Sequence, residues 1–404
     1  YFIKGKLKSV LKKIIYFIAN WISFFISSLI PVKKDLVIFT GTSISTYNEN
    51  SRYLYEYLVK NQELSPVWMT NSTIVYNYLD NKKYPVVWHK SFLGLWHYMR
   101  AGVVIATGMS YPSLLKFVGN KTIKIWVGHG TGVKGTNSTD GGPFGSSFEL
   151  VKKMHMFDYV NFTAKHVSLY QGKLQYLLPK YKIIVLGYPR CDNLLDKNYT
   201  DKAHTKKSIL KRFNYEIHGN EKFILYSPTW RPKQNSFTFP LSKIDNFNFL
   251  EFDSWLNEND IYFLISVHPS EFGNLKDFSN CNNIRYLPQD HLIDITQLLP
   301  EIDLLITDYS SIATDYMLMN RPVIYVMPDY DYYFNEYGLL EDIRLSLPGI
   351  EVKNMFELKS SIIRSLKNPG EMQSSRNIYL EKYYDTSNLS SCDKFLTFIE
   401  NLTI

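Results

Sequence analysis

The chain has 404 residues, 45% of them hydrophobic, which is enough to fill two cores of ordinary domain size. Its formal net charge is +7, but residues 1–34 hold seven lysines and no acidic residue, and removing those seven leaves 38 basic against 38 acidic residues. This distribution argues against a nucleic-acid-binding protein, which needs a basic face on a folded domain. The three cysteines lie far apart, form no metal or disulfide spacing, and suit a reducing compartment.

Residues 1–34 are predicted to associate with a membrane. The apolar run 14–30 would form a helix about 25 Å long, shorter than the roughly 30 Å hydrocarbon core of a bilayer. Asn20, Ser23 and Ser27 recur near helical spacing, which favours a helix lying in the interface, with the lysines on anionic lipid. A membrane span, a buried core helix and a signal peptide are the alternatives, although no small-residue cleavage site follows.

Short β-rich runs alternate with amphipathic segments along the rest of the chain. Helical patterns lie between the runs, as in residues 50–59 and 91–100. Two such series predict two doubly wound parallel-sheet domains, 35–200 and 201–375, followed by a helical segment, 376–404, that packs back across them. The runs are DLVIFTG (35–41), PVVW (85–88), AGVVIATG (101–108), TIKIWVGHG (122–130), KIIVLGYPR (182–190), KFILYSPTW (222–230), IYFLISVHP (261–269), DLLITDYS (303–310) and PVIYVMPD (322–329).

Ligands of open α/β sheets bind beyond the carboxyl ends of the strands, so candidate site residues are sought there. In IWVGHGTGVKG, His129 follows a strand, and Gly130 and Gly132 allow another molecule to approach the backbone. Residues 130–135 also satisfy GxGxxG, but the strand is late in its domain and no acidic residue lies cleanly about 20 residues on, which argues against a dinucleotide site. A neutral His129 suits a general base; the alternative is a histidine hydrogen-bonded in a turn.

The segment LISVHPSE repeats this arrangement in the second domain. His268 follows a strand, and Pro269 prevents continuation of the ladder. The two histidines could meet across one cleft, whereas a zinc site lacks its third and fourth ligands. Glu271 could orient a neighbouring group or be solvated.

The segment LYSPTWRP places Thr229 and Arg231 after another strand. A guanidinium suits bidentate contact with a phosphate, and an ordinary ion pair is the alternative for Arg231.

In LLITDYSSIATDY a helical pattern begins directly after a strand. The first amide groups of a helix attract anions, and Thr307, Ser310 and Ser311 add hydroxyl donors beside Asp308. A helix cap alone would need only one serine. The cluster therefore predicts a diphosphate site, and Asp315, one turn further, would face the same cleft and could bind a ligand hydroxyl.

Four motifs in this order resemble the CDP-glycerol glycerophosphotransferases, which are the teichoic-acid primases and polymerases with related capsule polymerases. The motifs are HGTxxK (129–134), SPTWR (227–231), HPSE (268–271) and ITDYSSIATDY…RPVIYVMPD (306–329). The family usually has a bulky aromatic residue before the first histidine and Pro after the Thr, where this chain has Gly128 and Gly132.

The resemblance implies a GT-B fold, in which two Rossmann-like domains face a cleft, with a membrane-associating N-terminal helix. It also implies a peripheral enzyme on the cytoplasmic side of the cell membrane, an N-terminal acceptor domain and a C-terminal domain that binds a CDP-polyol donor. The sequence itself has no evident metal motif and predicts no cofactor, although a loosely bound Mg²⁺ would leave no motif. In the family, the histidines at His129 and His268 are the essential pair. The family's donor-binding residues correspond to Thr307, Ser310, Ser311 and Asp315. Arg231 is added because a guanidinium after a strand suits a phosphate. The secondary candidates are Lys134, Thr229, Asp308 and Glu271.

The expected reaction transfers glycerol phosphate from CDP-glycerol to a hydroxyl of a lipid-linked or polymeric acceptor and releases CMP. His129 would take the acceptor proton, while His268, Arg231 and a helix N-terminus would neutralise the phosphoryl oxygens. Three alternatives stay open: a CDP-ribitol donor, a GT-B glycosyltransferase using a nucleotide sugar, and a membrane-bound module that binds nucleotide or polyol phosphate without reaction.

Overall fold

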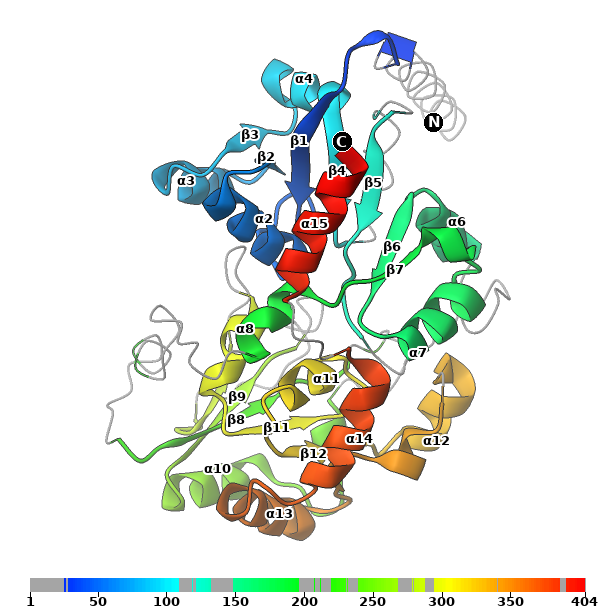
Figure 1. Cartoon of the computed structure of the whole chain (residues 1–404). Helices are drawn as coiled ribbons and strands as arrows, with labels where there is room; N and C mark the ends of the chain where they lie inside the picture. The colour runs from blue at the N-terminus through cyan, green and yellow to red at the C-terminus, as the bar shows by residue number, and fades with distance from the viewer. Residues whose placement is uncertain are drawn as a thin grey trace, which may run out of the picture.

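The computed structural model describes residues 25–26, 28–108, 118, 121–131, 148–195, 207, 211, 219–229, 231, 239–267, 278, 280–287, 294–339, 341–385 and 390–403. These residues form two parallel sheets, one in each half of the chain. Figure 1 shows the first sheet in the upper half of the molecule and the second in the lower half.

The first sheet has seven strands in the order β3-β2-β1-β4-β5-β6-β7. Every residue of β4 is buried, which explains why its sequence is a continuous apolar run instead of an alternating one. The strands are β1 (Lys33–Thr40), β2 (Ser65–Thr70), β3 (Val86–Trp88), β4 (Ala101–Ala106), β5 (Ile123–Trp126), β6 (Tyr159–Phe162) and β7 (Ile183–Val185).

The second sheet has six strands in the order β10-β9-β8-β11-β12-β13. Counted within this half, the order is 3-2-1-4-5-6, the doubly wound arrangement of nucleotide-binding folds. The strands are β8 (Lys222–Tyr226), β9 (Ile261–Ile265), β10 (Ile284–Tyr286), β11 (Leu304–Thr307), β12 (Val323–Tyr325) and β13 (Ile350–Glu351).

Helices cover the sheets and complete the two cores. In the first half they are α2 (Glu49–Asn61), α3 (Thr73–Asn81), α4 (Phe92–Arg100), α6 (Phe148–His155), α7 (Lys165–Val167) and α8 (Asp192–Leu195). After the boundary they are α10 (Phe249–Glu258), α11 (Ile312–Met317), α12 (Tyr330–Tyr332), α13 (Met355–Lys367), α14 (Gln373–Tyr383) and α15 (Ser391–Thr403).

Two doubly wound sheets, joined by hydrogen bonds between the two halves of the chain, make this a GT-B fold. This is the fold that the family resemblance predicted. In each sheet the strand order reverses at one point, between β1 and β4 in the first and between β8 and β11 in the second. Ligands of such sheets bind at these points, beyond the carboxyl ends of the strands. The two switch points therefore locate the region in which a site should be sought.

The C-terminal segment returns to the first half of the molecule. α14 packs against α11 of the second half, whereas α15 packs against α2 and lies beside β1 (Figure 1). The domain boundaries near residues 200 and 375 stay predictions.

Most of the N-terminal segment, residues 1–24, lies outside the described residues. Among the helices that the structure does describe, none has the length and apolar character needed to cross a bilayer. The placement of residues 14–30 on or across a membrane therefore stays a prediction.

Asp192 holds the start of α15. Its carboxylate accepts hydrogen bonds from the backbone N–H groups of Ser391 at 2.8 Å and Cys392 at 2.9 Å, two of the amides that a helix N-terminus leaves unpaired. We expect Asp192→Ala to lower the free energy of unfolding by about 1–2 kcal/mol, as loss of a helix cap does. Urea unfolding monitored by circular dichroism tests this, with Glu258→Ala, an exposed residue of α10, as the control. Equal stability of the two variants would contradict it.

Candidate functional site

His129 lies just beyond the carboxyl end of β5, with its side chain 59% exposed. The backbone before it is fixed at Gly128, whose φ is +94°. A Cβ at this position would lie 2.2 Å from the ring of Tyr188, so glycine is required on two counts. The Gly128 carbonyl accepts hydrogen bonds from Asn50 Nδ2 at 3.0 Å and from the hydroxyl of Thr107. This explains the glycine that stands where the resembling family usually has an aromatic residue.

Glu49, at the start of α2, lies beside His129. The distance from His129 Nδ1 to Glu49 Oε1 is 3.5 Å. Glu49 has a φ of 61°, which is unusual for a residue other than glycine and is typical of functional sites. Its backbone N–H donates to Asp294 Oδ2 of the second half at 2.6 Å. A carboxylate behind one ring nitrogen of a histidine can hold the ring and select its tautomer.

Arg190 joins this pair to the second half of the chain. Its side chain is 3% exposed and forms an ion pair with Glu49. Its Nε and Nη2 atoms lie 3.0 Å and 2.7 Å from Asp315 Oδ2, and Nη1 donates to the His129 carbonyl at 2.5 Å. One guanidinium therefore contacts the histidine backbone, the carboxylate beside that histidine, and a carboxylate from α11.

The protonation of this cluster is shifted by burial. Burial raises the pKa of Glu49 to about 8, because Arg190 opposes this change only in part and Asp294 and Asp315 add to it. Burial also raises the pKa of Asp315, again against the effect of Arg190. For Arg190, burial alone would lower the pKa, but Asp315 and Glu49 raise it well above its usual value. The guanidinium stays charged, and Glu49 is the group that gains or loses a proton near neutral pH.

The start of α11 contacts the His129 segment from the other side. A Cβ at Gly130 would lie 2.5 Å from Ser311 Oγ, so the serine hydroxyl lies against the backbone beside His129. Thr314 Oγ1 donates to the Thr131 carbonyl at 3.2 Å. Ser311 is the cap residue of α11 but its side chain makes no capping hydrogen bond. Capping therefore does not explain this serine, and its contact with a ligand phosphate stays a prediction.

A second polar cluster lies at the carboxyl ends of β8, β11 and β12. Arg231, only 2% exposed, makes a bidentate contact with Asp329 at 2.7 and 2.9 Å and donates to Asp308 Oδ2 at 2.7 Å. The hydroxyl of the buried Thr307 donates to the Ser227 carbonyl at 2.6 Å. In this conformation these groups bind to the protein itself, so their predicted contact with phosphate stays a prediction.

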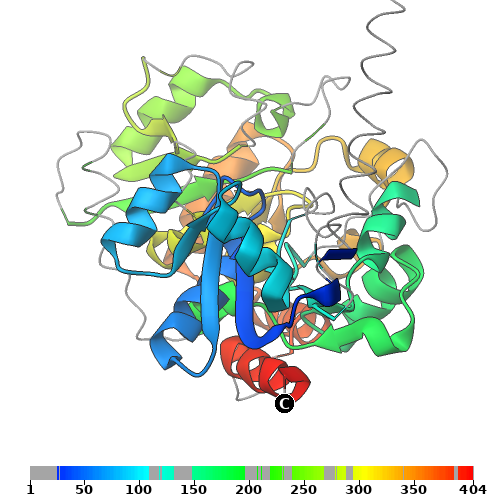
Figure 2. The same cartoon turned by 90° about the horizontal axis from the view of Figure 1, so that it is seen from above.

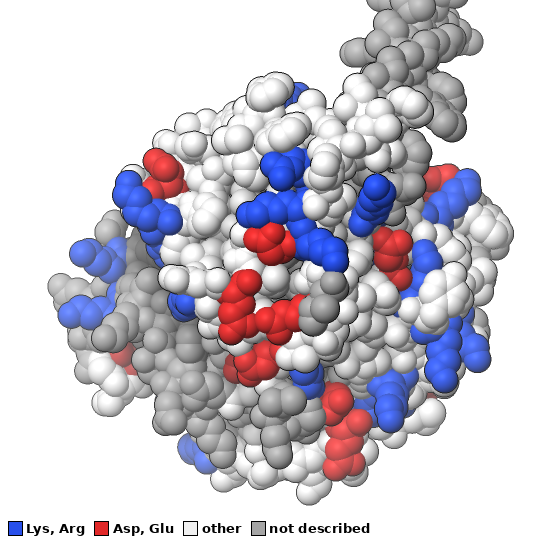
Figure 3. All heavy atoms as spheres, turned by 45° about the horizontal axis from the view of Figure 1, so that its top comes forward, with Lys and Arg blue, Asp and Glu red and all other residues white. Residues whose placement is uncertain are grey.

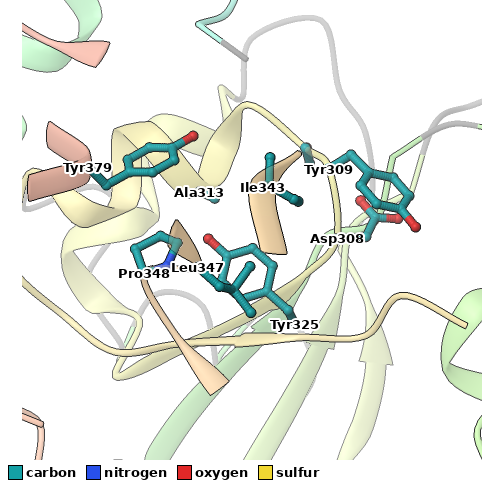
Figure 4. Close-up of a pocket in the computed structure, with 9 residues that line it drawn as sticks. Asp308, Tyr309, Ala313, Tyr325, Ile343, Leu347, Pro348 and Tyr379 are labelled. Atoms are coloured by element: carbon teal, nitrogen blue, oxygen red, sulfur yellow. The ribbon is translucent and has the colours of Figure 1, made fainter. Parts of the chain in front are cut away.

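A narrow pocket adjoins this cluster. Figure 4 shows Asp308 and Tyr309 on one side of it and Tyr379 on the opposite side, with Tyr325 and Leu347 between them. Ser310 also lines the pocket, which places one of the predicted hydroxyls on an accessible wall. The backbone N–H of Thr229 donates to Asp308, which lines the pocket, at 2.8 Å, and its buried Oγ1 has no hydrogen-bond partner among the described residues.

The structure thus brings together three of the predicted residues, His129, Ser311 and Asp315, through contacts between the two halves. Arg231, Thr307, Asp308 and Thr229 form the separate buried cluster. The predicted residues Lys134, His268 and Glu271 lie outside the described part of the chain.

Glu49, Arg190 and Asp294 were missed in the sequence. The strand-end rule could have found Arg190, which closes the run KIIVLGYPR after β7, whereas Glu49 starts α2 well beyond the end of β1 and has no such signal. Asp294 precedes a short 3-10 turn, Ile295–Gln297, and no strand-end pattern marks it. No group of three or more His, Cys, Asp or Glu residues within the described ranges is placed to hold a metal ion.

Comparison with known proteins gives one family over almost the whole chain. The family model described as CDP-Glycerol:Poly(glycerophosphate) glycerophosphotransferase matches residues 22–401. A teichoic acid poly(glycerol phosphate) polymerase of Bacillus spizizenii is 29% identical over 345 residues, which cover 81% of this chain and 83% of that protein. A teichoic acid glycerol-phosphate transferase of Staphylococcus aureus is 25% identical over 411 residues, covering 94% and 95%.

A solved structure of the wall teichoic acid polymerase TagF has the same fold. It superposes with a TM-score of 0.73 over 99% of this chain and 98% of that one, at 19% sequence identity.

Arg190 is the cation that the buried carboxyls of Glu49 and Asp315 share, so removing its charge should destabilise the folded chain. We expect Arg190→Met to lower the free energy of unfolding by about 3 kcal/mol at about pH 8, because Glu49 and Asp315 lose their counter-ion. Because the pKa of Glu49 is raised to about 8 in the folded chain, stability falls as the pH rises through that value. The loss in Arg190→Met should therefore be smaller near pH 5, where Glu49 binds a proton, and the raised pKa of Asp315 acts in the same direction.

Urea unfolding of wild type and variant at the two pH values measures this. Arg344→Met, which breaks a half-exposed pair with Glu351, is the matched control and should cost less than about 1 kcal/mol at both. An equal loss at both pH values for Arg190→Met would contradict the shared-cation interpretation.

Proposed function

The chain belongs to the CDP-Glycerol:Poly(glycerophosphate) glycerophosphotransferase family, and from this premise we propose that it transfers glycerol phosphate from CDP-glycerol to an acceptor hydroxyl. The observation that carries the proposal is the exposed His129, with Glu49 at its Nδ1 and the α11 serine segment beside it. In this proposal His129 is the proton acceptor and the neighbouring start of α11 binds phosphate.

The proposed step is a displacement at the β-phosphorus. The acceptor oxygen forms a bond to this phosphorus while the bond to the CMP phosphate oxygen breaks, and CMP leaves with the electron pair. His129 Nε2 takes the acceptor proton. With Glu49 ionised, 3.5 Å from Nδ1, the proposal keeps the ring proton on Nδ1 and leaves Nε2 unprotonated, so that Nε2 is the atom that acts as base.

The donor binds along the second half in this proposal. Ser310 and Ser311 supply hydroxyl donors to the diphosphate, and Thr229 supplies a buried hydroxyl that has no partner among the described residues. Arg231 holds Asp308 and Asp329 in place beside the proposed donor site. His268 and Lys134, which lie outside the described residues, are the further groups that we propose to neutralise phosphoryl charge.

We propose further that the enzyme works at the cytoplasmic face of the cell membrane on a teichoic-acid or capsule-type acceptor, either a polymer or its lipid-linked primer. The seven lysines and the apolar run within residues 1–34 support this location, since both favour an anionic membrane surface.

Nucleotide release tests the reaction. With CDP-glycerol and a lipid-linked acceptor, we expect wild type to release CMP and His129→Ala to release it about 10²–10⁴-fold more slowly, as for loss of a general base. His155→Ala, whose ring contacts the Tyr176 carbonyl in another part of the first half, is the matched control and should keep full activity.

The alternatives give different outcomes in the same assay. CMP release from CDP-ribitol in preference to CDP-glycerol would change the donor, and nucleoside diphosphate release from a sugar nucleotide would indicate a glycosyltransferase. Donor binding by wild type and His129→Ala without any product would support the binding module and contradict the proposed reaction.

A further inference from the structure

Helix α2 begins where the two halves of the molecule meet, and the residue before it does not cap it. Asn48 stands at the cap position, but its side chain makes no capping hydrogen bond. Its Oδ1 instead accepts from the backbone N–H of Thr42 at 3.1 Å, in the loop that follows β1. The first amides of a helix need an acceptor from outside the helix, so α2 requires one from elsewhere.

Asp294 of the second half supplies this acceptor. Its Oδ2 accepts a hydrogen bond from the backbone N–H of Glu49, the first residue of α2, at 2.6 Å. Asp294 is 4% exposed, and a carboxylate at a helix N-terminus also meets the positive end of the helix dipole. The helix of one half is therefore capped by a residue of the other half.

The turn that carries Asp294 presents this carboxylate to α2. Asp294 Oδ1 accepts from the Thr296 N–H at 2.9 Å, and Gln297 Oε1 accepts from the Asp294 N–H at 3.3 Å. This capping box uses one carboxylate oxygen and leaves Oδ2 for Glu49. The same Gln297 Oε1 accepts from Arg52 Nη1 at 2.9 Å, so the turn contacts α2 at two points about one helical turn apart.

The body of α2 is fixed within the first half. Leu54, Tyr55 and Leu58 are buried in the core that the helix shares with β1 and β2. On another side α15 packs along the helix, as Figures 1 and 2 both show. The first turn of α2 is therefore the part whose conformation contacts with the second half can change.

Glu49 has a backbone conformation that needs support. Its φ of 61° is rare for a residue with a side chain and persists only where surrounding contacts hold it. Asp294 binds its N–H and Arg190 binds its carboxylate. In this conformation the carboxylate lies 3.5 Å from His129 Nδ1. Loss of the Asp294 contact would free Glu49 to turn away from the histidine.

We propose that Asp294 is a positioning residue, which holds Glu49 beside His129 when the two halves of the molecule are in contact. In the proposed function the donor binds the second half and the base belongs to the first, so this contact would complete the base only when the halves have closed on each other. The inference rests on the proposed function for the role of His129 as base.

Asp294 also acts on the charge of Glu49. The Glu49 carboxyl is faced by Arg190 and His129 from the first half and by Asp294 and Asp315 from the second. Burial raises the pKa of Glu49 to about 8; Arg190 opposes this change, and the two aspartates add to it. A neutral side chain at position 294 should therefore lower this pKa, so that Glu49 loses its proton at a lower pH.

Burial makes Asp294 different from the acidic residues of the outer surface. Figure 3 shows Asp and Glu side chains on one face of the molecule, many of them next to Lys or Arg side chains at the surface. Water and salt screen such charges, and their pairs contribute little. Asp294 lies between the two halves, where screening is weaker, so neutralising it should have a measurable effect on Glu49.

Asp294→Asn separates the two caps that this carboxylate provides. Asparagine has one side-chain oxygen, which can keep the Thr296 bond, whereas the NH₂ group that replaces Oδ2 cannot accept from Glu49. The turn keeps its own cap, because asparagine caps as well as aspartate, and α2 loses its cap. Asp253→Asn is the matched control, since this carboxylate is 6% exposed and accepts backbone hydrogen bonds with both oxygens inside the second half.

Hydrogen exchange of the full-length chain measures the cap without an assay of activity. We expect the peptide that contains the Glu49 amide to take up deuterium about tenfold faster in Asp294→Asn than in wild type, as for loss of a helix cap. The peptide that covers residues 54–60 should exchange equally in both, and Asp253→Asn should leave both peptides unchanged. Equal exchange at the start of α2 in wild type and Asp294→Asn would overturn the proposal.

The pH profile of CMP release tests the consequence for the base. Asp294→Asn should lower kcat/KM by about tenfold, and its rise with pH should lie below that of wild type, which follows the Glu49 pKa of about 8. Asp253→Asn should keep the wild-type profile. A merely structural role of Asp294 would lower kcat/KM without moving the rise, and that result would overturn the proposal.

The two readouts also keep this proposal apart from the proposed reaction. Absence of CMP from wild type, together with faster exchange at Glu49 in Asp294→Asn, would overturn the proposed reaction while supporting Asp294 as the cap of α2.

Discussion

The contact on which this structure depends is the buried guanidinium of Arg190. It lies between Glu49 of the first half and Asp315 of the second, and also donates to the His129 carbonyl. A buried charge of this kind is stable only when its partners are in place. The same cation therefore links the two halves of the GT-B fold and fixes the backbone of the proposed base.

The two carboxyls differ in what they can do. Asp315 has two contacts with the guanidinium and receives the Cys191 thiol as a donor at 3.4 Å, so it anchors α11. Glu49 faces both Arg190 and His129, and burial raises its pKa to about 8. Glu49 therefore gains or loses its proton near pH 8, where the proposed mechanism needs Nε2 of His129 to be unprotonated. The cluster couples the contact between the domains to the protonation of the catalytic histidine.

The sequence predicts the sheets well because buried parallel strands are continuous apolar runs. Each of the nine runs contains a strand of the structure, and the predicted helices 50–59 and 91–100 correspond to α2 and α4. Four strands are absent from those runs. β2 has the sequence SPVWMT, in which Ser65 and Pro66 interrupt the apolar run. β6 has the polar Asn161 at a buried position. The edge strands β10 and β13 have only three and two residues, too few to show a pattern.

The sequence predicts only those site residues that are recognisable by their position directly after a strand. His129, Ser311 and Asp315 follow strands in motifs, so the strand-end rule finds them. Arg190 also follows a strand, but only the fold shows that it forms an ion pair with Glu49. Nor can the sequence show that the Arg231 donors bind Asp308 and Asp329, because this depends on how closely three strand ends approach each other.

The most direct measurement of the central claim is the pH dependence of kcat/KM for wild type and Glu49→Gln. In the proposed mechanism Glu49 must lose its proton so that the ring proton of His129 stays on Nδ1 and Nε2 is unprotonated, so wild-type kcat/KM should rise with pH through a group with pKa of about 8. Glu49→Gln should be slower and should lack the rise near pH 8. A variant that keeps the wild-type profile would show that Glu49 does not control the base.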